Sequence, residues 1–285
     1  MTPRIALVTG ASSGIGRASS QALREAGFRV VASARAEESV EALRGDGFDA
    51  VQLDVTVETS RERAIREIVR THGRVDLLVN NAGYGLSGPV ERLDLGDVRA
   101  QFETNVFGLV ALSRLVLPGM RERGSGRIVN IGSIGGTFTA PGSGAYHASK
   151  YAVEAFSDAL RLELAPYGVH VVLLQPTGVY TEFAGKLDGV YPDVPPDDPY
   201  AAFIVNHRRV TREMFEGPNR AGIVQASDVA RVVVKSATAP SPKARYKVGA
   251  GAVAIAAIRA LLPSRQFDKI VSRPFVPRAT GVDRP

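Results

Sequence analysis

The chain has 285 residues, of which 45% are apolar and 22% charged, an ordinary composition for a globular protein. It contains no cysteine, so disulfide frameworks and thiolate metal sites are excluded, and with four histidines no metal site is predicted. The net charge is +6, but the arginines are spread along the chain and often stand beside glutamate, which indicates solvated helix faces rather than a nucleic-acid site.

The absence of cysteine fits a reducing compartment, and strand-like sequence starts at the N-terminus with no signal-peptide pattern. The longest apolar stretch, residues 251–263, is interrupted by Arg259 and is too short to span a bilayer. We therefore expect a cytoplasmic protein without a transmembrane segment.

Short β-branched runs alternate with longer helical patterns up to residue 176. The strand-like runs are residues 5–9, 28–33, 50–55, 75–80, 126–132 and 169–176, with a last one at 244–249. The helical patterns lie near residues 15–26, 37–44, 57–71, 96–121 and 146–166. The runs are continuously apolar, as in strands that helices cover on both faces. This order predicts a single-domain, Rossmann-type α/β fold with a doubly wound parallel sheet of about seven strands.

The alternation of strand-like and helical segments ends after residue 176. Residues 177–200 are rich in Gly, Pro and Asp, a helical pattern follows at 201–217, and another begins at Ser227, a plausible N-cap. A long insertion after a strand is more often a functional lid than a simple connection, so a catalytic domain over residues 1–250 with a substrate lid at about 177–225 is expected.

The C-terminal part, residues 251–285, is expected to form a helix at 251–263 that packs on the domain or on a partner subunit. An interfacial membrane helix or a dimer contact is the alternative for this helix. Residues 272–285 are expected to be a loose or partner-docked tail.

The segment TGASSGIG follows the first strand and opens the first helix. Backbone N–H groups and the helix dipole at such a turn favour a pyrophosphate, and glycines allow its close approach. A tight turn also requires glycine, but the position after the first strand favours a dinucleotide site. The expected cofactor contacts are Gly10, Ser12, Ser13, Gly14, Ile15 and Gly16.

The end of the second strand carries Arg35 and lacks the acidic residue that would bind a ribose 2′-hydroxyl. Because Arg can fork onto a phosphate, NADP(H) is predicted over NAD(H), and Arg17 is a second candidate cation. A solvated Arg is the alternative interpretation.

Two further groups close the third and fourth strands, at the sheet edge where ligands bind: Asp54 with Val55, and Asn81 with Ala82 and Gly83. We expect these residues to contact the cofactor as well. Taken singly, Asp54 and Asn81 are equally typical of turns and caps.

Ser133 follows the fifth strand, and Tyr146 and Lys150 lie four residues apart on a predicted helix. Residues at this spacing share a helix face, and a nearby cation is expected to lower the tyrosine pKa. Such a tyrosine can exchange a proton with an alcohol or ketone oxygen that Ser133 also binds. A surface Tyr and Lys are the alternative, and His147 projects about 100° away from Tyr146, so it is left out of the mechanism.

Together these motifs resemble the short-chain dehydrogenases/reductases over roughly residues 4–250. The resemblance implies that Ser133, Tyr146 and Lys150 are catalytic, that Lys150 also holds the nicotinamide ribose, and that Asn105 completes a tetrad through a proton-relay water. It also places a PG-x-x-x-T-like segment beside the nicotinamide, although Thr177 intervenes between its Pro and Gly. The residues of that segment are Pro176, Gly178, Val179 and Thr181.

Longer stretches, such as NNAGYGLSGPVE and LRLELAPYGVHV, resemble the 17-beta-hydroxysteroid dehydrogenase-like branch, which includes retinol dehydrogenase-like proteins. That branch implies a hydrophobic alcohol or ketone as substrate. The family implies a homodimer or homotetramer built on the helices at 96–121 and 146–166. Some of the aromatic, apolar and histidine side chains near the site are expected to line an apolar pocket, although His207 alone is more typical of a surface. These are Tyr84, Leu86, His147, Tyr180, Phe183, Phe203, His207 and Phe215.

The sequence thus predicts an NADP(H)-dependent oxidoreductase that interconverts a lipophilic ketone and a secondary alcohol, with Tyr146 as general acid/base. One alternative is a 3-oxoacyl-type reductase whose Arg208, Arg209 and Arg212 meet an acidic carrier. Another is an NADP(H)-binding sensor without turnover.

Overall fold

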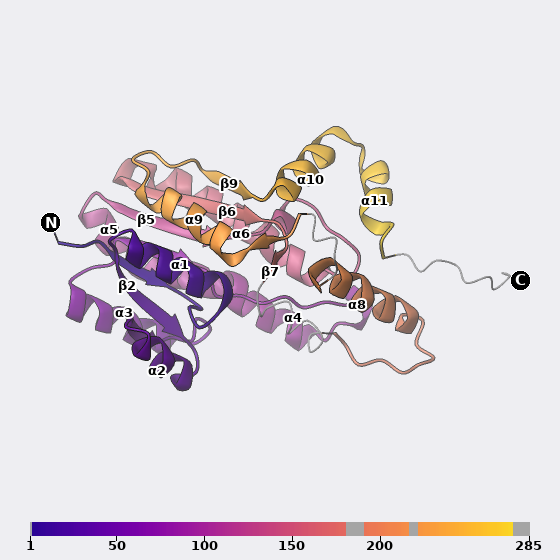
Figure 1. Cartoon of the computed structure of the whole chain (residues 1–285), viewed down its shortest axis with the longest axis horizontal. Helices are drawn as coiled ribbons and strands as arrows, with labels where there is room; N and C mark the ends of the chain where they lie inside the picture. The colour runs from indigo at the N-terminus through magenta and orange to yellow at the C-terminus, as the bar shows by residue number, and fades with distance from the viewer. Residues whose placement is uncertain (1, 181–190, 217–221, 276–285) are drawn as a thin grey trace, which may run out of the picture.

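The computed structural model describes residues 2–180, 191–216 and 222–275. Seven parallel strands form one sheet in the order β3-β2-β1-β4-β5-β6-β9, which confirms the predicted doubly wound α/β fold (Figure 1). The strands are β1 (Ile5–Val8), β2 (Arg29–Ala34), β3 (Asp49–Gln52), β4 (Leu77–Asn80), β5 (Gly126–Ile131), β6 (Val169–Pro176) and β9 (Arg245–Val248).

Helices cover both faces of the sheet, as the continuously apolar strands require. Successive strand residues enter different cores, so Ala6 and Val8 pack on one face while Ile5 and Leu7 pack on the other. The first face is covered by α1 (Gly14–Glu25), α2 (Glu37–Gly45) and α9 (Ala226–Thr238), and the second by α3 (Glu58–His72), α5 (Gly108–Glu122) and α6 (Gly144–Leu164).

The helix expected over residues 96–121 is interrupted. It consists of α4 (Leu95–Phe102), a π-helical turn (Glu103–Phe107) and α5, with the Gly108 N–H donating to the Glu103 carbonyl. A π turn adds one residue to a helix without changing its apolar composition, which is why the periodicity did not reveal it. Such turns are frequent at functional sites, and this one contains Asn105.

Several short elements were also not predicted. β7 (Val179–Tyr180) and β8 (Val224–Gln225) pair in parallel as a separate two-stranded sheet. The prediction of Ser227 as an N-cap is wrong: α9 begins at Ala226, and Gln225 caps it in a capping box with Asp228. Short 3₁₀ turns lie at Val90–Arg92, Ile134–Gly136 and Ala165–Tyr167.

Three helices lie beyond the carboxyl ends of the strands (Figure 1). They are α8 (Ala201–Glu216), α10 (Ala250–Leu261) and α11 (Ser264–Ser272). The helices expected at 201–217 and 251–263 are therefore present, and α10 contacts β9. The loose tail expected from residue 272 is wrong as far as Phe275, because α11 and the segment after it pack on the domain; residues 276–285 lie outside the described range.

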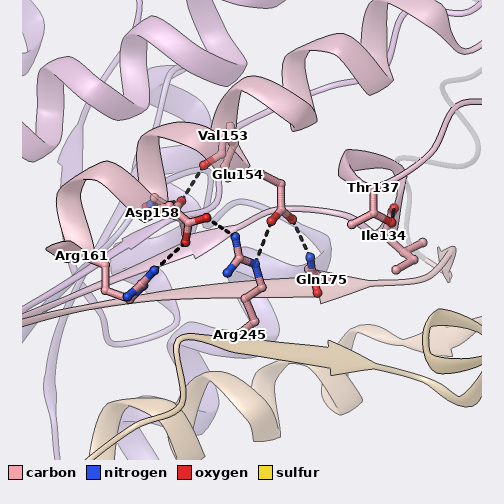
Figure 2. A network of polar contacts seen from close by, with 10 residues as sticks. Ile134, Thr137, Val153, Glu154, Asp158, Arg161, Gln175 and Arg245 are labelled. Carbon is pink, nitrogen blue, oxygen red and sulfur yellow. Dashed lines mark hydrogen bonds and ion pairs between the residues drawn. The ribbon is translucent and has the colours of Figure 1, made fainter. Parts of the chain in front are cut away.

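A polar network ties α6 to the last two strands of the sheet (Figure 2). The Glu154 carboxylate accepts from Gln175 Nε2 on β6 at 2.7 Å and from Arg245 Nε on β9 at 3.0 Å. Arg245 also pairs with Asp158, which holds the pKa of that carboxyl below its usual value. Because α6 carries Tyr146 and Lys150, this network helps to fix the helix on which both residues stand.

None of the helices in the described residues is both long enough and apolar enough to cross a membrane.

Arg245→Ala should lower the free energy of unfolding by about 1–2 kcal/mol, because it leaves the half-buried Glu154 without its cation. The depressed Asp158 pKa means that its contribution is present above the unfolded pKa and is lost as pH falls through the folded one. Urea unfolding should therefore show a constant difference from pH 8 to about pH 5 and a smaller one below about pH 4. The matched control is Arg66→Ala, which removes an exposed pair with Glu62 and should cost under about 0.5 kcal/mol. Equal losses in the two variants would contradict a special role for the network.

Candidate active site

The loop between β1 and α1 is shaped by three glycines. Gly10 and Gly14 have φ angles of +63° and +52°, a region that residues with a side chain rarely adopt. At Gly16 a Cβ atom would lie 2.2 Å from the Gly10 carbonyl oxygen and 2.5 Å from Asn81 Nδ2. The predicted glycine motif is therefore required by the backbone of the loop itself.

Asn81 joins this loop to the end of β4. Its Nδ2 donates to the carbonyl oxygens of Thr9 and Gly10 at 2.9 and 3.1 Å. In return, Thr9 Oγ1 accepts from the N–H groups of Asn81 and Ala82, both at 2.9 Å. The carboxyl ends of β1 and β4 are thus held together, and the Asn81 side chain is used for this purpose.

A cavity of about 610 Å³ opens along these loops. Most of the predicted cofactor and catalytic residues line it: Gly10, Ser12, Ser13, Gly14, Ile15, Asn81, Ala82, Gly83, Ser133, Tyr146, Lys150, Pro176, Gly178 and Val179. Within the described chain, the first turn of α1 carries no acidic residue, and its N-cap Ser13 makes no side-chain capping bond. The N-terminal N–H groups of α1 therefore suit a bound pyrophosphate, and the site fits a dinucleotide.

Lys150 is buried at the end of β5, where its Nζ donates to the Ile131 carbonyl oxygen at 2.9 Å. The same nitrogen lies 5.8 Å from the centre of the Tyr146 ring. The spacing of four residues on α6 has therefore brought the phenol and the ammonium into one wall of the cavity, as predicted.

The electrostatics of the pair differ from the expectation. Burial raises the pKa of Tyr146, and its hydrogen bond with Ser133 opposes the rise only in part. Burial also lowers the pKa of Lys150 to about 8. A tyrosine pKa lowered by Lys150 is therefore not found, because the ammonium binds the Ile131 carbonyl and desolvation dominates at both groups.

Asn105 lies in the π-helical turn, buried and next to the cavity rather than in its lining. Its amide contacts the backbone of Tyr84 on both sides: Oδ1 accepts from the N–H at 2.9 Å and Nδ2 donates to the carbonyl at 2.8 Å. Nδ2 also donates to Ser149 Oγ at 3.0 Å, one turn from Tyr146. The side chain therefore holds the loop after β4 against α6.

Other predicted cofactor residues lie outside the lining of the cavity. Gly16 packs behind the loop, as described above. Arg35 is exposed after β2, and Arg17 forms an ion pair with Asp46, so Arg17 is a poorer candidate cation than expected. Asp54 accepts from the N–H and hydroxyl of Thr56, a turn role, and its neighbour Val55 packs in the second core. Thr181 lies outside the described residues.

The part of the cavity beyond Tyr146 is bordered by residues that the sequence suggested only in part. Tyr84, His147, His207 and Phe215 line it, whereas Leu86, Tyr180 and Phe203 do not, and Phe183 lies outside the described range. His147, although left out of the mechanism, is a wall residue whose pKa burial lowers to about 4. Further lining residues that had not been predicted are Phe138, Ala140, Ser143, Thr211, Met214, Val271, Pro274 and Phe275.

His207, a candidate for the pocket, lines the cavity, and the competing interpretation as a surface residue is wrong, since it is 2% exposed. Its Nε2 lies 3.0 Å from the Pro141 carbonyl oxygen and its Nδ1 lies 2.6 Å from the Tyr191 hydroxyl. Long-range contacts of this kind leave no periodic signal. The sequence does contain a pattern that predicts the helix α11. Its apolar residues follow the i, i+3, i+4, i+7 spacing of a helix face: Phe267, Ile270, Val271 and Pro274.

The lowered Lys150 pKa makes a testable statement about stability. Between pH 8 and pH 10.5 the unfolded chain retains a proton that folded Lys150 has lost, so the stability of the wild type should rise with pH. Lys150→Met removes this term. The difference in unfolding free energy, wild type minus variant, should increase by about 2 kcal/mol between pH 7 and pH 9.5 in chemical denaturation. Lys235→Met, which changes an exposed lysine on α9, should show no such trend, and a flat difference for Lys150→Met would refute the lowered pKa.

Comparisons with known proteins agree with this site. The sequence model described as short chain dehydrogenase matches residues 4–189. The oxidoreductase YbbO of Escherichia coli is 36% identical over 93% of both chains. The NADPH-dependent 3-dehydrocapnine reductase of Ornithobacterium rhinotracheale is 34% identical over 94% of this chain and 95% of its own. Retinol dehydrogenase 8 of Bos taurus is 33% identical over 92% and 86%, which agrees with the branch that the motifs indicated.

Solved structures show the same fold. A short-chain dehydrogenase from Streptomyces avermitilis superposes with a TM-score of 0.76 at 31% identity, covering 95% of this chain and 97% of that one. A serine dehydrogenase complexed with NADP+ superposes with a TM-score of 0.74 at 30% identity, covering 86% and 94%. The chain therefore belongs to the short chain dehydrogenase family of oxidoreductases, whose members act on CH–OH and C=O groups.

Proposed function

We propose that this oxidoreductase uses NADP(H) to interconvert a lipophilic ketone and the corresponding secondary alcohol, with Tyr146 as the general acid/base. One observation carries the proposal: Ser133, Tyr146 and Lys150 stand in the wall of the same cavity as the glycine loop that suits a pyrophosphate. A cavity that joins the two can hold a dinucleotide and a small carbonyl compound side by side.

When bound, the reduced cofactor would provide the hydride that the carbonyl carbon accepts in the reducing direction. The Tyr146 hydroxyl donates its proton to the carbonyl oxygen, and the Ser133 hydroxyl orients that oxygen. The raised pKa of Tyr146 suits this role, because the phenol keeps its proton at neutral pH until the oxygen becomes basic. Lys150, still mainly protonated at pH 7, stabilises the phenolate that results, and in the oxidising direction Tyr146 takes the proton back.

The supporting roles follow from the contacts of Asn105 and Lys150. Asn105 joins the Tyr84 backbone to Ser149 on the catalytic helix, and its place in the π turn supports a part in proton relay. Lys150, held by the Ile131 carbonyl, would also reach the nicotinamide ribose. The lining residues Pro176, Gly178 and Val179 would border the nicotinamide, and Thr181 remains a predicted contact.

The lipophilic nature of the substrate is inferred from the lining of the cavity beyond Tyr146. Phe138, Met214, Phe215, Val271 and Phe275 present apolar surface there, as a hydrophobic carbonyl compound requires. Two relatives are named as a retinol dehydrogenase and a 3-dehydrocapnine reductase, which supports the same class of substrate.

Arg35 supports the preference for NADP(H). It is exposed directly after β2, and no ion pair engages it within the described residues. Burial and the charge of Asp97 raise the pKa of Tyr84, whereas the positive charge of Arg35 lowers it. Arg35 is therefore close enough to act on Tyr84, which lines the cavity. A guanidinium there can bind the 2′-phosphate, and the named NADP+ complex of a structural neighbour agrees with this choice.

The two alternatives have less support. For a carrier-linked 3-oxoacyl substrate, Arg209 is occupied by Glu213 and Asn206, and Arg208 lies over the Tyr191 ring, so these side chains already have partners within α8 and its surroundings. For a sensor without turnover, the convergence of Ser133, Tyr146 and Lys150 has no purpose.

We also propose a homodimer or homotetramer built on α6 and the α4–α5 segment. Tyr151 and Leu162 are exposed on α6, and Leu95 and Phe107 are exposed in the α4–α5 segment. Exposed apolar side chains of this kind are typical of subunit interfaces. Light scattering should give two or four times the 30.3 kDa chain mass, and a monomer would contradict this arrangement.

Tyr146→Phe should reduce turnover of a lipophilic ketone by about 10³-fold or more, because the variant has no proton to donate. NADPH binding, measured by fluorescence of the reduced nicotinamide, should remain within about threefold of the wild type because the cavity wall is otherwise intact. Tyr167→Phe, which changes an exposed tyrosine just after the same helix, is the matched control and should retain full activity. Near-normal turnover by Tyr146→Phe would show that another group transfers the proton.

Arg35→Ala should weaken NADPH binding by about 10–100-fold, the value of a charge-assisted hydrogen bond, while NADH binding changes little. Titration of the two reduced cofactors followed by fluorescence measures both constants. Arg44→Ala on α2, whose guanidinium already pairs with Glu41, should leave both unchanged. If Arg35→Ala weakens the binding of NADPH and NADH equally, the arginine does not bind the 2′-phosphate.

A further inference from the structure

A segment near the C-terminal end of the described chain lines the cavity. Val271 belongs to α11, and Pro274 and Phe275 follow the helix; all three line the cavity together with residues of α8 such as Met214 and Phe215. The segment is thus part of the site, although it begins 125 residues after Tyr146 in the sequence.

A line of ring contacts connects α11 with the catalytic tyrosine. The Phe267 side chain, 2% exposed, meets Phe138 at 5.7 Å between ring centres. Phe138 lies 5.6 Å from His147, which in turn lies 5.7 Å from Tyr146. The helix that ends in the cavity wall is therefore packed against the same group of rings that surrounds the reacting phenol.

Phe275 is held in place from the other side by α8. Its ring stacks on His207 with 4.8 Å between centres and 21° between planes, and Asn206 Nδ2 donates to its carbonyl oxygen at 2.8 Å. The Pro141 carbonyl can only accept, so His207 Nε2 carries the hydrogen and Nδ1 accepts from the Tyr191 hydroxyl. Burial lowers the pKa of His207, so it is a neutral platform for Phe275 whose two ring nitrogens both have hydrogen-bond partners within the protein.

The position of this wall in the chain is informative. The match to the short chain dehydrogenase family ends at residue 189, after Ser133, Tyr146 and Lys150. The lining residues of α8 and of residues 271–275 come later. The part of the chain common to the family therefore supplies the chemistry, and a part outside that match borders the space for the substrate.

We propose that the segment Val271–Phe275, with Phe275 seated on His207, determines the size of substrate that this enzyme accepts. The proposal rests on the proposed function, because it concerns the substrate end of the same site. Phe275 limits the length of the cavity, so changing the volume of its side chain should change the choice between bulky and compact ketones in a predictable direction.

The test uses two substitutions that change the side-chain volume at position 275 in opposite directions. Phe275→Ala enlarges the cavity and should raise the ratio of kcat/KM for a bulky aryl ketone over a compact aliphatic ketone by about tenfold. Phe275→Trp fills the cavity and should lower the same ratio by about tenfold. Both variants should bind NADPH like the wild type, since the contacts of Phe275 are with His207 and Asn206 on α8 rather than with the glycine loop. Should one variant fail to fold in a thermal melt, the other decides alone.

Ile270→Ala and Ile270→Trp are the matched controls, because Ile270 is exposed on α11 and does not line the cavity. Their ratios should stay within about twofold of the wild type. If the Phe275 pair also stays within that range while the wild type reduces both ketones, the proposed function holds and the size-determining wall is refuted.

A second readout keeps the wall testable if the wild type reduces neither ketone, a result that would count against the proposed function. A fluorescent naphthyl ketone is titrated into each protein in the presence of NADP+, and its dissociation constant is measured. Tighter binding to Phe275→Ala and weaker binding to Phe275→Trp, with both Ile270 variants unchanged, supports the wall. Equal constants for all five proteins overturn it.

Discussion

The site depends on a buried ammonium group. Lys150 is 7% exposed, and burial lowers its pKa to about 8, so the folded chain bears a cost to keep this cation at the end of β5. The Ile131 carbonyl offsets part of that cost by accepting from Nζ. The orientation of the ammonium under the Tyr146 ring follows from this bond, and with it the electrostatic surroundings of the phenol. A surface lysine at the same distance would be screened by water and would stabilise a phenolate far less.

Keeping that group in place requires a helix that cannot shift. Contacts of α6 with two other parts of the fold meet the requirement: Glu154 and Asp158 bind Arg245 on β9, and Ser149 accepts from Asn105 in the π-helical turn. Asn105 in turn holds the Tyr84 backbone, so the loop after β4 is positioned by the same helix. The loop after β4, the π-helical turn and α6 are therefore joined by the hydrogen bonds of one side chain, Asn105.

How far the sequence could predict this arrangement depended on how far apart in the sequence the interacting residues lie. The glycine loop, the doubly wound parallel sheet and the shared face of Tyr146 and Lys150 follow from local spacing, and the structure brings them together as expected. The direction of the Tyr146 pKa, the burial of His207 and the place of Phe275 depend on contacts between segments far apart in the chain. Local patterns do not encode desolvation, and the π turn at Asn105 adds a residue without altering the apolar pattern.

The cavity has one part with strict sequence requirements and another with loose ones. This difference explains why motifs reveal the chemistry of such an enzyme more readily than its substrate. Backbone geometry restricts Gly10, Gly14 and Gly16 to one residue type, and the pair on α6 needs a phenol and an amine at a fixed spacing. The wall formed by α8 and residues 271–275 needs only apolar side chains of suitable volume, which many sequences satisfy. The strict part can therefore be recognised as a motif, whereas the permissive part is identified only when the structure shows which side chains line the cavity.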